Sequence, residues 1–134
     1  MEENKKYRLT DQSMLYNGKL IYRIEALKDF NDVKKGEYGG FVESEDNLSQ
    51  DGNCWVYGNA KLYDYVIIKD DAHVFADAIV KDTAMVYGNA QVYGNAQVFE
   101  KAEVLEYARI YDDAKVHGNA VAYGDCYIHD FADI

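Results

Sequence analysis

A six-residue unit, Val-Tyr-Gly-Asn-Ala-Gln, is written twice in residues 86–98 and repeats with decay on both sides. Aliphatic residues fall at every sixth position from Val56 to Ile134, and small residues, mostly alanine, fall two positions before each of them. A helix cannot keep such a repeat on one face, because six is not a multiple of 3.6 but is three times the strand period of two. The repeat therefore predicts short strands separated by regular corners, where Gly-Asn or Asp supplies the turn residues.

Each unit is too short to bury its own apolar side, whereas stacked units bury a continuous core. Both ladders are predicted to point inward, so Cys54 and Cys126 on the small ladder are predicted as buried thiols. Four coils of about 4.8 Å separate them, which is too far for a disulfide. The following residues are predicted to stack in one inward column: Val56, Val74, Val92, Ile110 and Ile128.

The pattern aliphatic–x–Gly–Asn–Ala–x resembles the hexapeptide repeat of left-handed β-helix proteins over about residues 38–134. The resemblance implies an all-β fold, a left-handed parallel β-helix in which three hexads form one coil of a triangular prism. The Gly-Asn-Ala repeats that follow a β-rich N-terminal segment also resemble small phage and prophage proteins.

The N-terminal part lacks the repeat and is predicted as a small β-hairpin cap. Asn17-Gly18 is a strong two-residue hairpin signal between two alternating segments. We predict residues 1–37 to form the cap and a connection, and residues 38–134 to form the β-helix, with Gly39-Gly40 as a corner of its first, irregular coil. The chain begins MEENKKY, and no stretch is long enough to span a membrane, which predicts a cytoplasmic or virion-associated protein without membrane contact.

Net charge is −10 and is unevenly spread. Residues 1–37 hold eight Lys/Arg and seven Asp/Glu, whereas residues 38–134 hold six and seventeen. Such an acidic prism is expected to repel nucleic-acid backbones, so no direct nucleic-acid binding is predicted. The charge serves solubility, attracts a basic protein surface, or mimics nucleic acid; the sequence leaves these alternatives open.

Aromatic side chains gather at the outward positions of one predicted face. If they form a flat platform, they are a candidate binding site for a partner; the alternative is a ladder of stacked rings that stabilises the strands. The predicted members are Trp55, Tyr57, His73, Phe75, Tyr93 and Tyr111.

A second face carries apolar side chains that point away from the core, and such solenoid faces usually bury against another copy. Because hexapeptide-repeat proteins are commonly trimers, the resemblance implies a homo-oligomer, with a trimer favoured. The predicted oligomer face consists of Ile67, Met85, Tyr87, Leu105, Val121 and Tyr123. One corner column, Asp64, Asp82 and Glu100, is predicted to be a solvated acidic edge rather than a calcium site.

The resemblance also covers enzymes, namely acyltransferases with a histidine base and carbonic anhydrases with three histidine ligands. The histidines of this chain, His73, His117 and His129, are not predicted to converge, and no loop is inserted after Val56. We therefore predict no catalytic residues, no metal, no cofactor and no acyl transfer. The leading hypothesis is a non-catalytic binding or assembly module that contacts a host or phage protein or other copies of itself. The alternatives are an acyltransferase-like enzyme and an acidic inhibitor that mimics nucleic acid.

Overall fold

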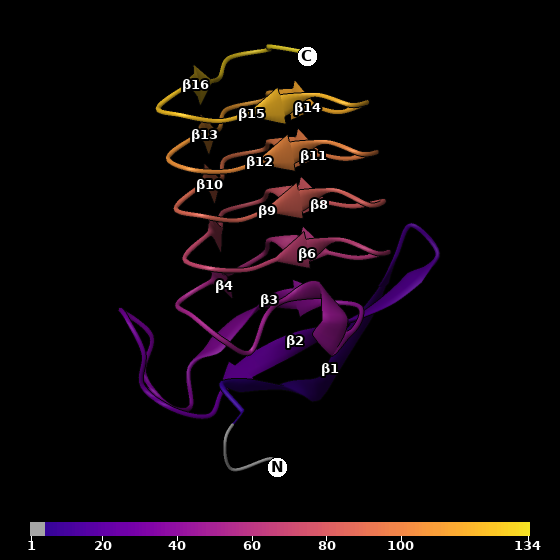
Figure 1. The fold of residues 1–134 in the computed structure, drawn as a ribbon. Coiled ribbons are helices and arrows are strands. Elements are labelled where there is room, and N and C mark those ends of the chain that lie inside the picture. Colours follow the sequence, from indigo (N-terminus) through magenta and orange to yellow (C-terminus); the bar gives the residue numbers. More distant parts are fainter. Residues whose placement is uncertain (1–4) are drawn as a thin grey trace.

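The computed structural model describes residues 5–134, and its regular structure is almost entirely β: an N-terminal antiparallel hairpin followed by short strands stacked in parallel coils (Figure 1). Consecutive two-residue strands belong to different sheets, so three sheets run the length of the solenoid. One sheet contains β4 (Trp55–Val56), β7 (His73–Val74), β10 (Gln91–Val92), β13 (Arg109–Ile110) and β16 (Tyr127–Ile128). The second contains β6 (Ile67–Ile68), β9 (Met85–Val86), β12 (Glu103–Val104) and β15 (Val121–Ala122). The third contains β5 (Lys61–Leu62), β8 (Ile79–Val80), β11 (Gln97–Val98) and β14 (Lys115–Val116).

From β4 onward, paired strands are in strict register with partners 18 residues apart. Val74 pairs in parallel with Val56 and with Val92, and Ile110 pairs with Val92 and with Ile128. The predicted inward column is therefore confirmed, as is the all-β solenoid. The left-handed sense of the coil stays a prediction of the resemblance.

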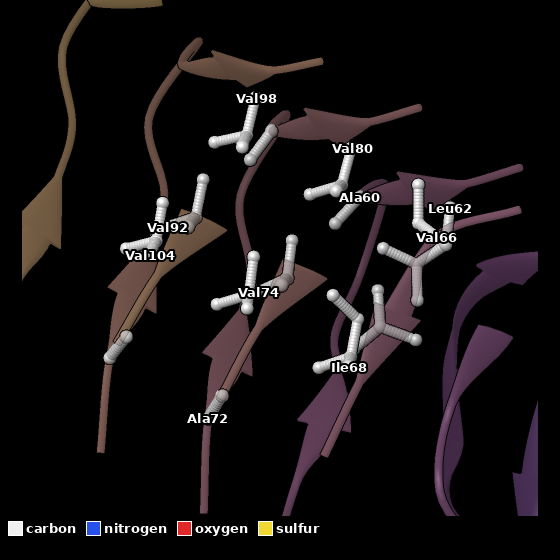
Figure 2. Packing of buried hydrophobic residues seen from close by; sticks show 14 of the residues in the cluster. Ala60, Leu62, Val66, Ile68, Ala72, Val74, Val80, Val92, Val98 and Val104 are labelled. Carbon is white, nitrogen blue, oxygen red and sulfur yellow. The ribbon is translucent and has the colours of Figure 1, made fainter. Parts of the chain in front are cut away.

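The interior is filled by the two predicted ladders. Aliphatic residues such as Val74 and Val92 and small residues such as Ala60 and Ala72 are fully buried along the axis (Figure 2). Ala90 is also fully buried. Both cysteines are free thiols. Cys54 is buried as predicted, whereas the prediction of a buried Cys126 is wrong, because Cys126 is partly exposed in the last coils.

Ala90→Leu is expected to destabilise the protein by about 1–3 kcal/mol, because extra methyl groups in a well-packed core force side chains and backbone apart. Thermal unfolding measures the effect, with Gln91→Leu as the control, because Gln91 lies next to Ala90 but points outward. An unchanged melting temperature for Ala90→Leu would show that the interior has room to spare.

Every corner from Gly52 to Asp130 begins with a residue of positive φ. Eight of these residues are not glycine, namely Asp64, Asp70, Ala76, Asp82, Glu100, Glu106, Asp112 and Asp130. Positive φ costs about 1–2 kcal/mol for residues with a Cβ, less for Asp and Asn. The carboxylates among them offset part of this cost: Asp82 accepts a hydrogen bond from the backbone N–H of Glu100, one coil further, at 2.8 Å.

The cap begins with an antiparallel hairpin of β1 (Tyr7–Tyr16) and β2 (Lys19–Ala26), which turns at Asn17-Gly18 as predicted. β2 pairs with β3 (Tyr38–Val42) antiparallel, and β3 pairs with β5 in parallel, so one sheet joins the cap to the solenoid. A short 3-10 helix, η2 (Glu45–Asn47), follows. The hairpin covers the first coil, and the domain boundary at residue 37 stays a prediction.

The prediction of a corner at Gly39-Gly40 is wrong. Both glycines lie inside β3 and are buried against the next coil. A Cβ on Gly39 would lie 2.6 Å from the carbonyl oxygen of Val56, and one on Gly40 would lie 2.6 Å from that of Ala60. Close backbone approach, rather than a turn, requires glycine at these two positions.

Candidate interaction faces

The first candidate is the aromatic face, defined as the outward side of the β4–β7–β10–β13–β16 sheet. Phe75 and Tyr93 stack at 4.6 Å with an interplanar angle of 4°, and Tyr93 and Tyr111 stack at 5.1 Å and 5°. His129 continues the stack on Tyr111 at 5.1 Å and 11°. Because each ring covers the face of its neighbour, the stack presents ring edges to solvent. This geometry favours the stabilising ladder over a flat platform for a partner.

Trp55 does not belong to this exposed surface, contrary to the prediction. It is 1% exposed and packs edge-on against Tyr7 of β1 and Phe30 of the connection. Tyr57 is half-buried beside the same connection, where its hydroxyl donates to Asp32 Oδ1 at 2.9 Å. Burial, followed by this hydrogen bond, raises the pKa of Tyr57 above its ordinary value. The alternation of inward and outward residues along the strand predicts that Trp55 points outward. In the structure it does point outward from the coil, but the folded cap covers it.

The second candidate is the apolar face, defined as the outward side of the β6–β9–β12–β15 sheet. Ile67 is 41% exposed, Val121 52% and Tyr123 63%, whereas Met85 and Leu105 are partly exposed. The remaining predicted member, Tyr87, donates its hydroxyl to Glu103 Oε1 at 2.9 Å, and Lys69 lies 5.0 Å from its ring centre.

Two exposed tyrosines at the corners flank this face, and sequence reasoning missed both. Tyr65 is 81% exposed and Tyr107 is 60% exposed. Both stand at the second corner position, which Asn, Asp, Lys or Thr occupies at most other corners. That departure from the corner pattern is the signal that identifies them.

Charge is sorted between corners and faces. Residues 55–134 hold thirteen Asp/Glu. Eleven of them stand at corners, and the other two, Glu103 and Asp133, lie on the faces. Residues 55–134 also hold six Lys/Arg, and all but Lys101 point outward from the faces. The apolar face carries one cation, Lys69, and one anion, Glu103, so its own charge is zero on a chain of net charge −10.

The acidic corner column of Asp64, Asp82 and Glu100 is more than a solvated edge. Asp64 accepts from the N–H of Asp82 at 3.2 Å and also pairs with Lys19 Nζ of the hairpin at 3.0 Å. Glu100 accepts from the N–H of Gly118 at 2.9 Å. These carboxylates tie each coil to the next and the first of them to the cap.

The three histidines lie apart, as predicted. His117 stacks on Phe99 at 4.7 Å, and its two ring nitrogens face carboxylates of Glu100 and Asp133. These two carboxylates, Asp133 first, raise the pKa of His117 above its ordinary value.

The raised pKa predicts a pH dependence with a defined sign. The two pairs of His117 contribute their full stability below the pKa that His117 has in the unfolded chain. This contribution is lost as pH rises through the higher pKa that His117 has in the folded protein. We expect the ring titration of His117, followed by NMR, to have a higher midpoint in the folded protein than in urea. Asp133→Asn is expected to lower that midpoint, and equal midpoints in water and urea would contradict the pairing.

One exposed group could hold a metal ion. Its members are Asp112, His129 and Asp130, each of which offers a ligand atom within 4.8 Å of the others. All three are exposed, and Asp112 also accepts from the N–H of Asp130 at 3.0 Å, as other corner carboxylates do. The prediction of no metal stays a prediction.

A polar groove of about 440 Å³ follows the corner between the apolar and aromatic faces, beside the connection of the cap. His73 lies in it, and its Nε2 is 3.2 Å from the carbonyl oxygen of Asn53. Its lining residues are Asn31, Asn53, Asp71, His73, Asn89, Gln91, Tyr107 and Arg109. Sequence reasoning missed this groove because Asn31 comes from the cap and is remote in the chain.

No protein-family model matches this chain. A protein of Escherichia coli (strain K12) named "Uncharacterized acetyltransferase YdcK" is 38% identical over 61 residues. The match spans 40% of this chain and about a fifth, 19%, of that protein. Together with the solenoid, the match fits the resemblance to hexapeptide-repeat proteins. Within residues 5–134 the structure contains no helix long and apolar enough to cross a membrane.

Proposed function

We propose that this chain is a binding module that associates with other copies of itself through the apolar face. The observation that carries the proposal is the exposure of large apolar side chains, Ile67, Val121 and Tyr123, on the outward side of one sheet. Burying half of such a side chain against a partner contributes on the order of 1 kcal/mol. Several of them together offset the loss of freedom on association.

The charge distribution supports a second copy as the occupant. Two chains of net charge −10 repel each other, and the repulsion is smallest where they meet without facing charges of one sign. The apolar face, with Lys69 and Glu103 only, meets that condition, whereas the corners hold eleven carboxylates. Association is therefore expected to strengthen as salt screens the corners. The resemblance favours a trimer.

Sedimentation of the wild type beside a double variant tests the proposal. Ile67→Glu with Val121→Glu places two charges on the apolar face at exposed positions, where they do not disturb the core. Gln97→Glu with Lys115→Gln, which changes the net charge by the same two units, is the matched control on the outward side of the β5–β8–β11–β14 sheet. We expect oligomers for the wild type and the control, and a folded monomer for the first variant. A wild type that stays monomeric at high concentration and moderate salt contradicts the proposal.

The match to the acetyltransferase-named protein favours a second candidate, acyl transfer. His73 is the residue best placed as a base, because it lines the polar groove. If Nε2–H donates to Asn53, the neutral ring keeps Nδ1 free to accept a proton. Acetyl transfer from acetyl-coenzyme A that is lost in His73→Ala but kept in His117→Ala supports this candidate. Equal activity in both variants rejects it.

A further inference from the structure

The polar groove differs from the rest of the prism surface in its chemistry. Arg109 is the single arginine of residues 38–134, it is exposed, and no ion pair involves it within the described residues 5–134. Its guanidinium lies 5.4 Å from the ring centre of Tyr127, which supports the group without using its N–H donors. Although the chain is strongly acidic, this groove therefore offers an anionic ligand a cation that forms no ion pair within the described residues.

Two further rows of polar groups converge on the same groove. Gln91 and His73 continue the column of Arg109 through the paired strands β13, β10 and β7. Asn89 of the neighbouring corner and Asn31 of the cap connection also line the groove.

One carboxylate, that of Asp71, also lines the groove and is engaged within the fold. Asp71 Oδ1 accepts a hydrogen bond from the backbone N–H of Asn53 at 3.3 Å. This bond orients Asp71 without removing its charge, so the groove carries one cation, Arg109, and one carboxylate two coils away, which can accept hydrogen bonds from hydroxyl groups.

We propose that the groove binds a small polyol that carries a phosphate or carboxylate group. The anion binds Arg109, whose planar fork forms two hydrogen bonds with either group. The hydroxyl groups extend along Gln91 toward His73, whose Nδ1 accepts a hydrogen bond in the tautomer that donates Nε2–H to the carbonyl oxygen of Asn53. Two coils separate Arg109 from His73, about 10 Å along the axis at about 4.8 Å per coil, which suits a ligand of hexose size. Binding here does not require association through the apolar face.

Calorimetric titration with three probes tests the site: glucose 6-phosphate, glucuronate and uncharged glucose. We expect saturable binding of at least one charged probe and at least a tenfold weaker affinity for glucose. Arg109→Gln is expected to weaken the charged probe about tenfold or more, and Arg109→Lys to weaken it less. Lys81→Gln is the control, because it removes a cation from another face of the prism.

The variants distinguish specific binding in the groove from nonspecific attraction of a charged probe to any cation on the surface. A loss of affinity in Arg109→Gln with none in Lys81→Gln supports the proposal, and the charged probe that binds decides between phosphate and carboxylate. Equal losses in both variants, equal affinity of wild type and Arg109→Gln, or no saturable binding of either charged probe overturns it. Circular dichroism of each variant verifies that the fold is intact.

Discussion

Gly40→Ala is expected to lower the free energy of unfolding by about 3 kcal/mol or more, because overpacking against rigid backbone lies at the upper end of such effects. The added Cβ would lie 2.6 Å from the carbonyl oxygen of Ala60 and 2.8 Å from Cγ2 of Val56. The carbonyl oxygen accepts the ladder hydrogen bond from the N–H of Phe41, so relief of the clash must separate β3 from β5. The junction between cap and solenoid would then open.

Denaturant unfolding measures this effect, with Gly58→Ala as the matched control. A Cβ on Gly58 meets nothing within 4 Å, although its φ of +58° adds strain. The control is expected to cost about 1–2 kcal/mol from backbone strain alone. If the two variants lose equal stability, the close approach of the strands at Gly40 is not what requires glycine there.

Lys6→Met is the second change with a large expected effect, a loss of about 2–4 kcal/mol. Lys6 is 1% exposed, and its Nζ donates to the carbonyl oxygens of Cys54 at 2.7 Å and Gly52 at 3.2 Å. Burial lowers the pKa of Lys6. Methionine keeps the apolar stem and the volume but removes this donor from both carbonyls of the first coil, of which that of Cys54 is buried.

The matched control is Lys5→Met, because Lys5 is a partly exposed neighbour whose Nζ pairs with Glu45 Oε1 at 3.0 Å. Such pairs contribute about 0–1 kcal/mol, so the control is expected to unfold close to the wild type. Equal denaturant midpoints for Lys6→Met and wild type would show that the Lys6 ammonium is not needed to close the end of the solenoid.

The repeat was sufficient to predict the solenoid because every sixth residue repeats one chemical environment. The inward column of Val74 and Val92 follows from period and register alone, without any knowledge of tertiary contacts. The corners follow similarly, since Gly, Asn and Asp tolerate positive φ.

What the period could not predict depends on contacts between distant parts of the chain. Trp55 has the phase of an outward residue and is nevertheless buried, because Tyr7 and Phe30 fold over it. Gly40 resembles a turn residue until β3 is placed against β5. The polar groove is lined by Asn31 of the cap as well as by Arg109 of the solenoid, and no local pattern links the two.

Photo-cross-linking tests the apolar face most directly. Benzoylphenylalanine is placed at Val121 of β15 in one sample and at Lys115 of β14 in the other, which are exposed outward positions of consecutive strands. Our account predicts a covalent product of two chains from position 121 and little from position 115. Equal yields from the two positions, or no product from position 121 at a concentration where the wild type sediments as an oligomer, would contradict association through the apolar face.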